Sequence, residues 1–354
     1  MSIPTLPGIT ARTVTTSRLS TRVLFSGPED GVPVLFIHGN ASNATFWEET
    51  MLALPAGFRG IAPDLRGYGE ADRAAKIDAH NRGVGDWVDD ALALLDHLGA
   101  AQAHLVGHSL GCAAVWGLMM DAPVRIRTVT LVAPSSPFGF GGTKDLNGTP
   151  CYADYAGSGG GVVNPEFPTR ISQGDRSSES PTGSPRVVMN SFYWKPPFIP
   201  AREEDFLSAL LSEHIGPEAY PGDFVASPNW PNVAPGRWGP INAISPKYVG
   251  DVTRLYRSDP KPPVLWVRGS HDQIVSDTSL FDFGTLGALG AVPGWPGAEV
   301  YPSQPMVGQT RAVLEQYAAA GGAYREVVIE DTAHTPYVEN PAAFYAAFHP
   351  HLKS

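Results

Sequence analysis

The sequence is poor in cysteine and has neither a long hydrophobic run nor an excess of positive charge. Only Cys112 and Cys151 occur among 354 residues, too few for a disulfide framework and without the spacing of a zinc site. We therefore expect two reduced thiols and no bound metal. No stretch approaches the ~18 apolar residues of a membrane-spanning helix, and residues 1–26 lack the basic start and apolar segment of a signal peptide. The expected location is cytoplasmic.

The charge balance argues against two further classes of partner. Asp and Glu number 35 against 25 Lys and Arg, a net charge of −10, which repels phosphate backbones and anionic lipid surfaces. We therefore expect neither nucleic acid nor a membrane as a partner. Hydrophobic residues make up 43% of the chain and charged residues 17%, a balance that supports a sizeable core and excludes a disordered protein. The 34 prolines and 38 glycines indicate long, shaped loops on a regular scaffold.

The first part of the chain alternates short apolar runs with a helical pattern. Residues 32–37, 103–106 and 128–132 are β-rich runs of the kind that is buried in a parallel sheet. Between the first two, residues 84–98 place apolar side chains at three-to-four-residue spacing, and Gly99 ends the run as a helix C-terminal glycine does. This alternation predicts an α/β fold with a doubly wound sheet, whose ligands bind at the carboxyl ends of the strands.

The middle of the chain has a different composition. Residues 135–245 are dominated by Pro, Gly, Ser and aromatic residues, and only residues 201–215 have a clear helical period. We interpret 135–245 as an inserted cap, and residues 1–134 and 246–354 as the α/β core.

The α/β pattern then resumes, with a second interruption. Residues 263–267 and 325–329 are further strand-like runs. Between them, residues 279–305 are rich in Gly and Pro and uncommonly long for a loop in a compact domain. This stretch is either functional or a docking surface, and the sequence does not decide between the two.

A candidate nucleophile follows the strand that ends at Val106. Residues 107–111 read Gly-His-Ser-Leu-Gly and open the helical run 112–120. A serine between small residues, on a sharp turn from strand to helix, is typical of a nucleophile elbow, in which the hydroxyl is raised above the sheet. The N–H groups of the following helix favour a negative charge beside Ser109.

Two further side chains complete a catalytic constellation. A serine hydroxyl needs a base within hydrogen-bond reach, and the base needs an orienting group. Asp272 comes just after the run 264–267, and His334 just after the run 326–329. Both are therefore expected at the carboxyl edge of the sheet, in the chain order Ser109, Asp272, His334.

These landmarks carry a resemblance to a known family. The chain resembles α/β-hydrolase-fold serine hydrolases of the esterase, lactonase and C–C hydrolase branch, over roughly residues 20–134 and 250–354. Residues 36–40 (Phe-Ile-His-Gly-Asn) are similar to the family's His-Gly loop, and residues 62–69 (Ala-Pro-Asp-Leu-Arg-Gly-Tyr-Gly) to its Asp-x-Arg-Gly-x-Gly loop. The resemblance implies a mostly parallel eight-stranded sheet with an inserted cap. It also implies an oxyanion hole made by the backbone N–H groups of Leu110 and Asn40, with Ala41 as a substitute for the latter.

Other polar residues near these motifs compete for the same roles. We interpret His38 and His108 mainly as structural or pocket-shaping residues, and Asp64 as a loop-fixing carboxylate. His271 precedes the candidate acid, but as the base it would leave the histidine after the last strand unexplained. Some family members carry the acid after the sixth strand, where this sequence has no carboxylate before Asp145.

The cap aromatics favour a bulky, apolar or aromatic substrate. The sequence therefore predicts a hydrolase of carboxylic esters or lactones that needs no cofactor, with a C–C bond hydrolase or a cofactor-free perhydrolase as alternatives and a ligand-binding receptor as the alternative of a different class. Haloalkane dehalogenases and epoxide hydrolases need a carboxylate nucleophile, and position 109 is serine. The oligomeric state stays open, a homo-oligomer included. The candidate substrate contacts are His38, Ala41, Phe138, Tyr193, Trp194 and Trp230.

Overall fold

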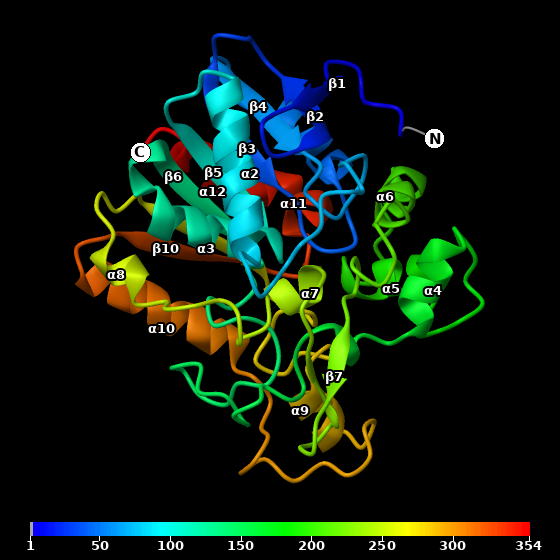
Figure 1. Ribbon diagram of the computed structural model, residues 1–354. Coiled ribbons are helices and arrows are strands. Elements are labelled where there is room, and N and C mark those ends of the chain that lie inside the picture. The colour runs from blue at the N-terminus through cyan, green and yellow to red at the C-terminus, as the bar shows by residue number, and fades with distance from the viewer. Residues whose placement is uncertain (1–2) are drawn as a thin grey trace.

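An eight-stranded sheet forms the centre of the computed structural model, which describes residues 3–354 (Figure 1). The strand order is β1-β2-β4-β3-β5-β6-β9-β10. Every pairing from β4 to β10 is parallel, whereas β2 is antiparallel to both of its neighbours. The doubly wound, mostly parallel sheet predicted from the sequence is therefore confirmed. The strands are β1 (Thr10–Thr15), β2 (Ser20–Ser26), β3 (Val32–Ile37), β4 (Phe58–Pro63), β5 (Ala103–His108), β6 (Ile126–Val132), β9 (Val264–Gly269) and β10 (Tyr324–Ile329).

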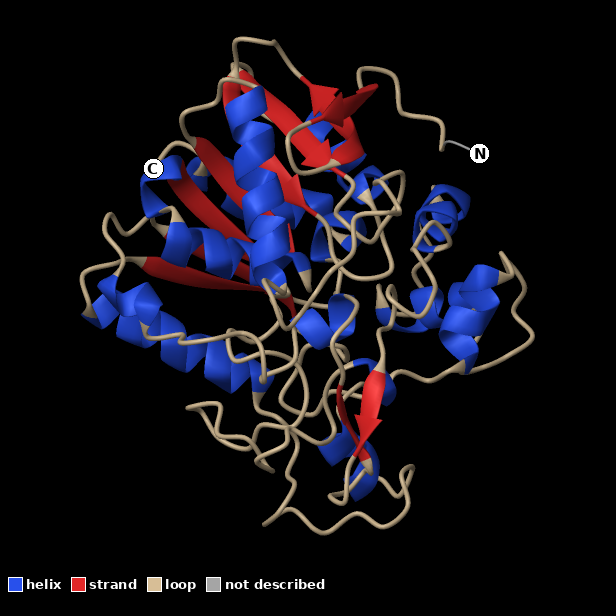
Figure 2. Ribbon diagram, in the orientation of Figure 1, coloured by secondary structure: helices blue, strands red, loops and turns tan. Residues whose placement is uncertain are grey.

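Helices cover both faces of this sheet. In Figure 2 the long helices α2 and α3 lie in front of the strands and α12 lies behind them. None of the helices in residues 3–354 has both the length and the apolar character needed to cross a bilayer. The helical elements of the core are η1 (Ala44–Trp47), α1 (Glu48–Leu52), α2 (Val84–His97), α3 (Gly111–Asp121), η2 (Pro123–Arg125), α8 (Arg254–Arg257), α10 (Met306–Ala319), α11 (Pro336–Glu339) and α12 (Pro341–His351).

Helix α2 shows how the sequence pattern produces this packing. Its apolar side chains at three-to-four-residue spacing, Trp87, Val88 and Leu94 among them, form a buried stripe against the sheet layer. The helix stops before Gly99, which takes a φ of 67° that a side chain would make costly. The predicted helix is thus confirmed to within one residue.

The segment interpreted as a cap, residues 135–245, lies between β6 and β9 and is called the cap below. Its elements are short and joined by long loops, as the Pro and Gly content indicates. The expected helix over 201–215 is shorter than predicted. It ends early because Ser212 donates both its N–H and its hydroxyl to the Ala209 carbonyl, and His214 N–H then bonds Gly67 O of the core. The elements are η3 (Gly160–Val162), α4 (Glu166–Ser172), α5 (Pro185–Phe192), α6 (Glu203–Leu210), β7 (Phe224–Ala226), β8 (Val233–Pro235) and α7 (Pro240–Ala243).

The Gly/Pro-rich segment 279–305 packs on the cap. It contains α9 (Phe283–Ala288) and lies beside β7 in Figure 1. Trp230 of the cap donates its indole N–H to Pro293 O at 2.9 Å, and its ring lies 4.9 Å from that of Tyr301. Tyr301 in turn donates to Ala156 O at 3.2 Å. The cap layer is therefore built from two stretches that are far apart in the sequence.

Candidate active site

Ser109 lies on a strained turn between β5 and α3. Its φ is 53°, which is uncommon for a residue other than glycine, and its N–H bonds Val132 O at 2.9 Å. The flanking glycines are needed for space. A Cβ at Gly107 would lie 2.7 Å from Val115 Cγ2, and one at Gly111 would lie 2.7 Å from Ile37 O. This is the strand, tight turn and helix that the sequence predicts.

His334 and Asp272 form a buried hydrogen-bonded pair. His334 Nδ1 lies 2.8 Å from Asp272 Oδ2, and both residues are buried. Asp272 Oδ1 accepts the N–H groups of Ile274 at 2.8 Å and Val275 at 3.0 Å, which hold the carboxylate in place. A carboxylate at Nδ1 assigns the proton to that atom and leaves Nε2 as an acceptor.

The loop that carries Ser109 contacts both neighbouring loops. His108 Nε2 lies 2.9 Å from His334 O, and the two imidazole rings are 4.8 Å apart. A Cβ at Gly39 would lie 3.0 Å from Ser109 Cβ. Within residues 3–354, neither Ser109 Oγ nor His334 Nε2 has a hydrogen-bond partner. Catalytic hydrogen bonds of this kind are often long without substrate and tighten in the complex.

Backbone donors flank Ser109 on two loops. The N–H groups of Leu110, Asn40 and Ala41 donate to no residue in the described part of the chain. Leu110 and Ala41 are buried, and buried N–H groups are rarely left unpaired. Ala41 also has a left-handed φ of 44°, a second strained residue in this region. The residues predicted for the oxyanion hole therefore supply free donors beside the candidate nucleophile.

The other histidines differ from His334 in their surroundings. His38 bonds Gly39 O through Nδ1 at 2.8 Å and accepts Leu65 N–H at Nε2 at 3.0 Å, so both ring nitrogens are occupied by backbone. Burial lowers the pKa of His38 to about 4 and holds the pKa of His108 well below its usual range. His271 is exposed.

The competing acids have structural partners. Asp64 is buried and accepts the N–H groups of Ala44 and Glu70, which fixes the loop after β4. Asp145 is half-buried and accepts backbone N–H groups of its own loop. Asp272 thus remains the carboxylate in contact with the candidate base.

The predicted substrate contacts lie in different surroundings. Trp194 is fully buried among cap residues such as Phe206, and Trp230 packs on the segment 279–305. Phe138 packs beside Gly148, where a Cβ would overlap its ring. Tyr193 differs from these three, because its ring lies 6.4 Å from that of His334 and its hydroxyl bonds Ala41 O.

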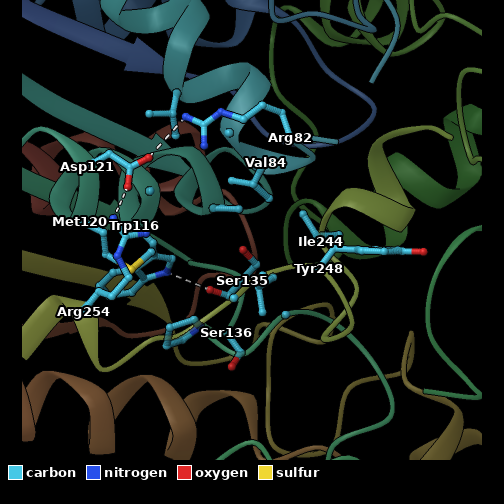
Figure 3. A pocket seen from close by; sticks show the side chains of 18 residues that line it. Arg82, Val84, Trp116, Met120, Asp121, Ser135, Ser136, Ile244, Tyr248 and Arg254 are labelled. Atoms are coloured by element: carbon cyan, nitrogen blue, oxygen red, sulfur yellow. Dashed lines mark hydrogen bonds and ion pairs between the residues drawn. The ribbon is translucent and has the colours of Figure 1, made fainter. Parts of the chain in front are cut away.

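A cavity of about 200 Å³ lies beside α3, between the two chain segments that lead into and out of the cap (Figure 3). Its wall includes Trp116 and Ser135, and Arg82 and Arg254 form ion pairs with Asp121 at its edge. No member of the Ser109, Asp272 and His334 set lines it. Within the described chain, no group of three His, Cys, Asp or Glu side chains is arranged to hold a metal ion.

The sequence did not reveal one carboxylate at the site. Glu339 of α11 accepts Ala333 N–H at 2.7 Å, next to His334, and Lys195 N–H of the cap at 2.7 Å. In the sequence Glu339 resembles an ordinary helix residue. Only its spacing of five residues from His334 marks its nearness, and nothing local indicates its cap partner.

Comparison with known proteins identifies the family. Residues 32–284 match the family described as alpha/beta hydrolase fold. A 2-hydroxymuconate semialdehyde hydrolase of Pseudomonas sp. (strain CF600) is 38% identical over 105 residues, 29% of this chain and 36% of that protein. Epoxide hydrolase A of Mycobacterium tuberculosis (strain ATCC 25618 / H37Rv) is 36% identical over 131 residues, 36% of this chain and 40% of that protein. The aligned region thus spans well under half the length of these curated relatives.

Among solved structures, a 2-hydroxy-6-oxo-6-phenylhexa-2,4-dienoate hydrolase from Rhodococcus sp. strain RHA1 is similar to nearly the whole chain. The TM-score is 0.61 at 17% identity, covering 98% of this chain and 99% of that one. At this identity the likeness concerns the fold. Together with the family match over most of the sequence, it leads to one conclusion: the chain belongs to the alpha/beta hydrolase fold family.

Proposed function

We propose that this protein is a serine hydrolase that cleaves a carboxylic ester or lactone through Ser109, His334 and Asp272. The observation that carries the proposal is the strained serine next to unpaired N–H groups, with a buried histidine–carboxylate pair on the adjoining loop. An ester needs nothing more than a nucleophile, a base that becomes an acid, and donors for the oxyanion.

The reaction proceeds in two halves. His334 Nε2 takes the proton of Ser109 as its Oγ attacks the acyl carbon, and the carbonyl electron pair moves onto oxygen, where the N–H groups of Leu110 and of Asn40 or Ala41 stabilise it. The tetrahedral intermediate collapses, the C–O bond breaks, and the imidazolium protonates the leaving alcohol. Water then attacks the acyl-enzyme with His334 again as base, which releases the acid and restores Ser109.

A second candidate function has specific support. One curated relative is named a 2-hydroxymuconate semialdehyde hydrolase, and one structural neighbour a 2-hydroxy-6-oxo-6-phenylhexa-2,4-dienoate hydrolase. Both named substrates are unsaturated acids with an aldehyde or ketone and no ester, so their hydrolysis would break a C–C bond. The same serine attack on a ketone would produce this outcome, provided that the substrate stabilises the departing carbanion. The epoxide hydrolase relative suggests a different chemistry. That chemistry requires a carboxylate nucleophile at the elbow, where this chain has Ser109.

The test combines labelling with turnover. A fluorophosphonate should label the wild-type protein at Ser109 and should not label the Ser109→Ala variant. Both proteins should then be assayed on aryl esters, alkyl esters, aromatic and macrocyclic lactones, and β-diketones. Ester or lactone hydrolysis that is lost in Ser109→Ala supports the proposal. Diketone cleavage alone supports the C–C hydrolase, and labelling without any turnover supports a ligand receptor. Hydrolysis of all the short acetate esters at similar rates, without hydrolysis of any ring-bearing ester, would contradict the expectation of a bulky substrate.

A further inference from the structure

One short piece of the cap is hydrogen-bonded to both catalytic loops. Tyr193, which directly follows α5, places its hydroxyl 2.9 Å from Ala41 O and 3.3 Å from Asn40 O. The carbonyl of the same residue accepts Thr335 N–H at 2.8 Å and the Thr335 hydroxyl at 2.6 Å. A single cap residue therefore connects the loop that carries the candidate oxyanion donors with the loop that carries His334.

The neighbouring residues strengthen the second of these connections. Lys195 N–H donates to Glu339 Oε1 at 2.7 Å, and Glu339 Oε2 accepts Ala333 N–H at 2.7 Å. The Lys195 ammonium also pairs with Asp331. The segment 193–195, which we call the strap, is thus tied to the chain immediately before and after His334.

The phenol of Tyr193 is held firmly in this position. The residue is 7% exposed, and its ring lies 6.1 Å from those of Phe46 and Trp194. Burial raises the pKa of Tyr193, so its hydroxyl keeps its proton and can act as a donor. Since neither acceptor oxygen belongs to a flexible side chain, the hydrogen bonds report directly on the orientation of the loop backbone.

That orientation matters for the oxyanion. The C=O and N–H of one planar trans peptide point in opposite directions, so holding Asn40 O on the phenol directs the Ala41 N–H away from it. Ala41 is in the left-handed region, a strained conformation that persists only where the surroundings impose it. The single phenol O–H, which the two carbonyl oxygens share at 2.9 and 3.3 Å, is such a constraint. A donor contributes to an oxyanion hole only when it is already aimed at the developing charge.

We propose that Tyr193 is a positioning residue of the reaction proposed above. Its hydroxyl fixes the peptide between Asn40 and Ala41, and with it the Ala41 N–H as an oxyanion donor, and its carbonyl fixes the loop of His334. This inference rests on the proposed function, and it differs from the sequence-based expectation that Tyr193 contacts the substrate. In the structure the hydroxyl already has protein acceptors, so its removal should affect the transition state more than substrate binding.

The experiment compares two variants that lose the same kind of bond. Tyr193→Phe removes the phenol on the strap. Tyr317→Phe is the matched control. Tyr317 of α10 is also buried, and its hydroxyl also donates to a backbone carbonyl, Pro262 O at 2.8 Å. Steady-state kinetics use an ester that the wild-type protein hydrolyses in a Ser109-dependent manner, and thermal unfolding of each variant checks that it is folded.

We expect Tyr193→Phe to lower kcat about tenfold with KM nearly unchanged, because the oxyanion donors are loosened but still present. Complete loss of a donor would lower kcat about 100-fold or more. Phenylboronic acid, which forms a tetrahedral adduct with an active serine, should bind about tenfold more weakly. The pH dependence of kcat should not move, since the base keeps its carboxylate partner. Tyr317→Phe should retain wild-type kcat.

Two results would overturn the inference. In one, kcat and boronate binding of Tyr193→Phe stay within twofold of wild type. In the other, KM rises while kcat is unchanged, which would make Tyr193 a substrate contact.

Thr335→Val, which removes only the 2.6 Å bond to Tyr193 O, is the second variant if Tyr193→Phe is unfolded. We expect it to lower kcat a few-fold, and unchanged kcat would equally count against the strap. Either failure leaves the proposed function intact so long as the wild-type activity depends on Ser109.

Discussion

Replacing Asp272 by Asn tests the assignment of the base and its orienting group. The two oxygens of Asp272 have different partners: Oδ1 accepts two backbone N–H groups, and Oδ2 faces His334 Nδ1. In Asp272→Asn the amide oxygen must take the place of Oδ1, because an NH₂ group there would face the N–H donors of Ile274 and Val275. The NH₂ group is then forced toward His334 and requires an unprotonated Nδ1.

The consequence is a base in the wrong tautomer. With its proton moved to Nε2, His334 cannot accept the proton of Ser109. An orienting carboxylate of this kind is worth about 10⁴-fold in kcat, or about 5.5 kcal/mol in the activation free energy. Because Oδ1 keeps both backbone bonds, we expect the variant to fold and its unfolding midpoint to stay near that of the wild type.

Steady-state ester hydrolysis of wild type, Asp272→Asn and Glu330→Gln measures this effect. Glu330 is the matched control, an exposed carboxylate four residues before His334 that takes no part in the strap contacts. We expect a loss of about four orders of magnitude in the first variant and less than a few-fold change in the second. If Asp272→Asn kept more than a tenth of the wild-type kcat, another group would orient the base and the proposed triad would be wrong.

Two further predictions concern stability. Gly111→Ala should destabilise the protein by at least about 2 kcal/mol, because the added methyl group overlaps His38 O and lies 2.7 Å from Ile37 O, and urea unfolding measures the loss. Gly216→Ala is the control for the methyl group itself, because a Cβ at Gly216 would meet no atom within 4 Å and the residue has no left-handed φ. Burial raises the pKa of Asp282 from 3.8 to about 6. The contribution of this raised pKa to the free energy of unfolding is therefore fully present below pH 3.8 and is lost as pH rises through 6. The free energy of unfolding of Asp282→Asn should therefore fall less than that of wild type over this pH range, and parallel curves would contradict the assignment.

The parts of the fold that could be predicted are those specified by local sequence. Strands β3, β5, β6 and β9 are short apolar runs because most of their residues are buried inside the sheet, whereas β10 at the sheet edge is only partly buried. Helix α2 shows its buried stripe and its terminal glycine directly. The elbow is equally local, since Ser109 stands between two glycines at which an added Cβ would meet neighbouring atoms. The positions of Asp272 and His334 follow from where their strands end.

The parts that could not be predicted depend on contacts between distant segments. Nothing near Trp230 indicates that it packs on the segment 279–305, and the sequence left the role of that segment open. The cap aromatics were interpreted together as a substrate wall. Local pattern cannot separate a ring such as Trp194, which fills the cap interior, from one such as Tyr193, whose hydroxyl reaches the core 152 residues away.

The sheet and the cap hold different parts of the candidate site. The candidate nucleophile, base and acid each follow a strand of one sheet, so the sheet sets their approximate positions without help from the cap. The free N–H groups of Asn40 and Ala41 follow β3 by three and four residues, and Ala41 has a strained backbone. The strap adds a constraint on this backbone from the cap side of the site. A cap displacement that broke the bonds of Tyr193 would release the oxyanion loop and the His334 loop together, and the donor geometry would therefore depend on the cap being seated.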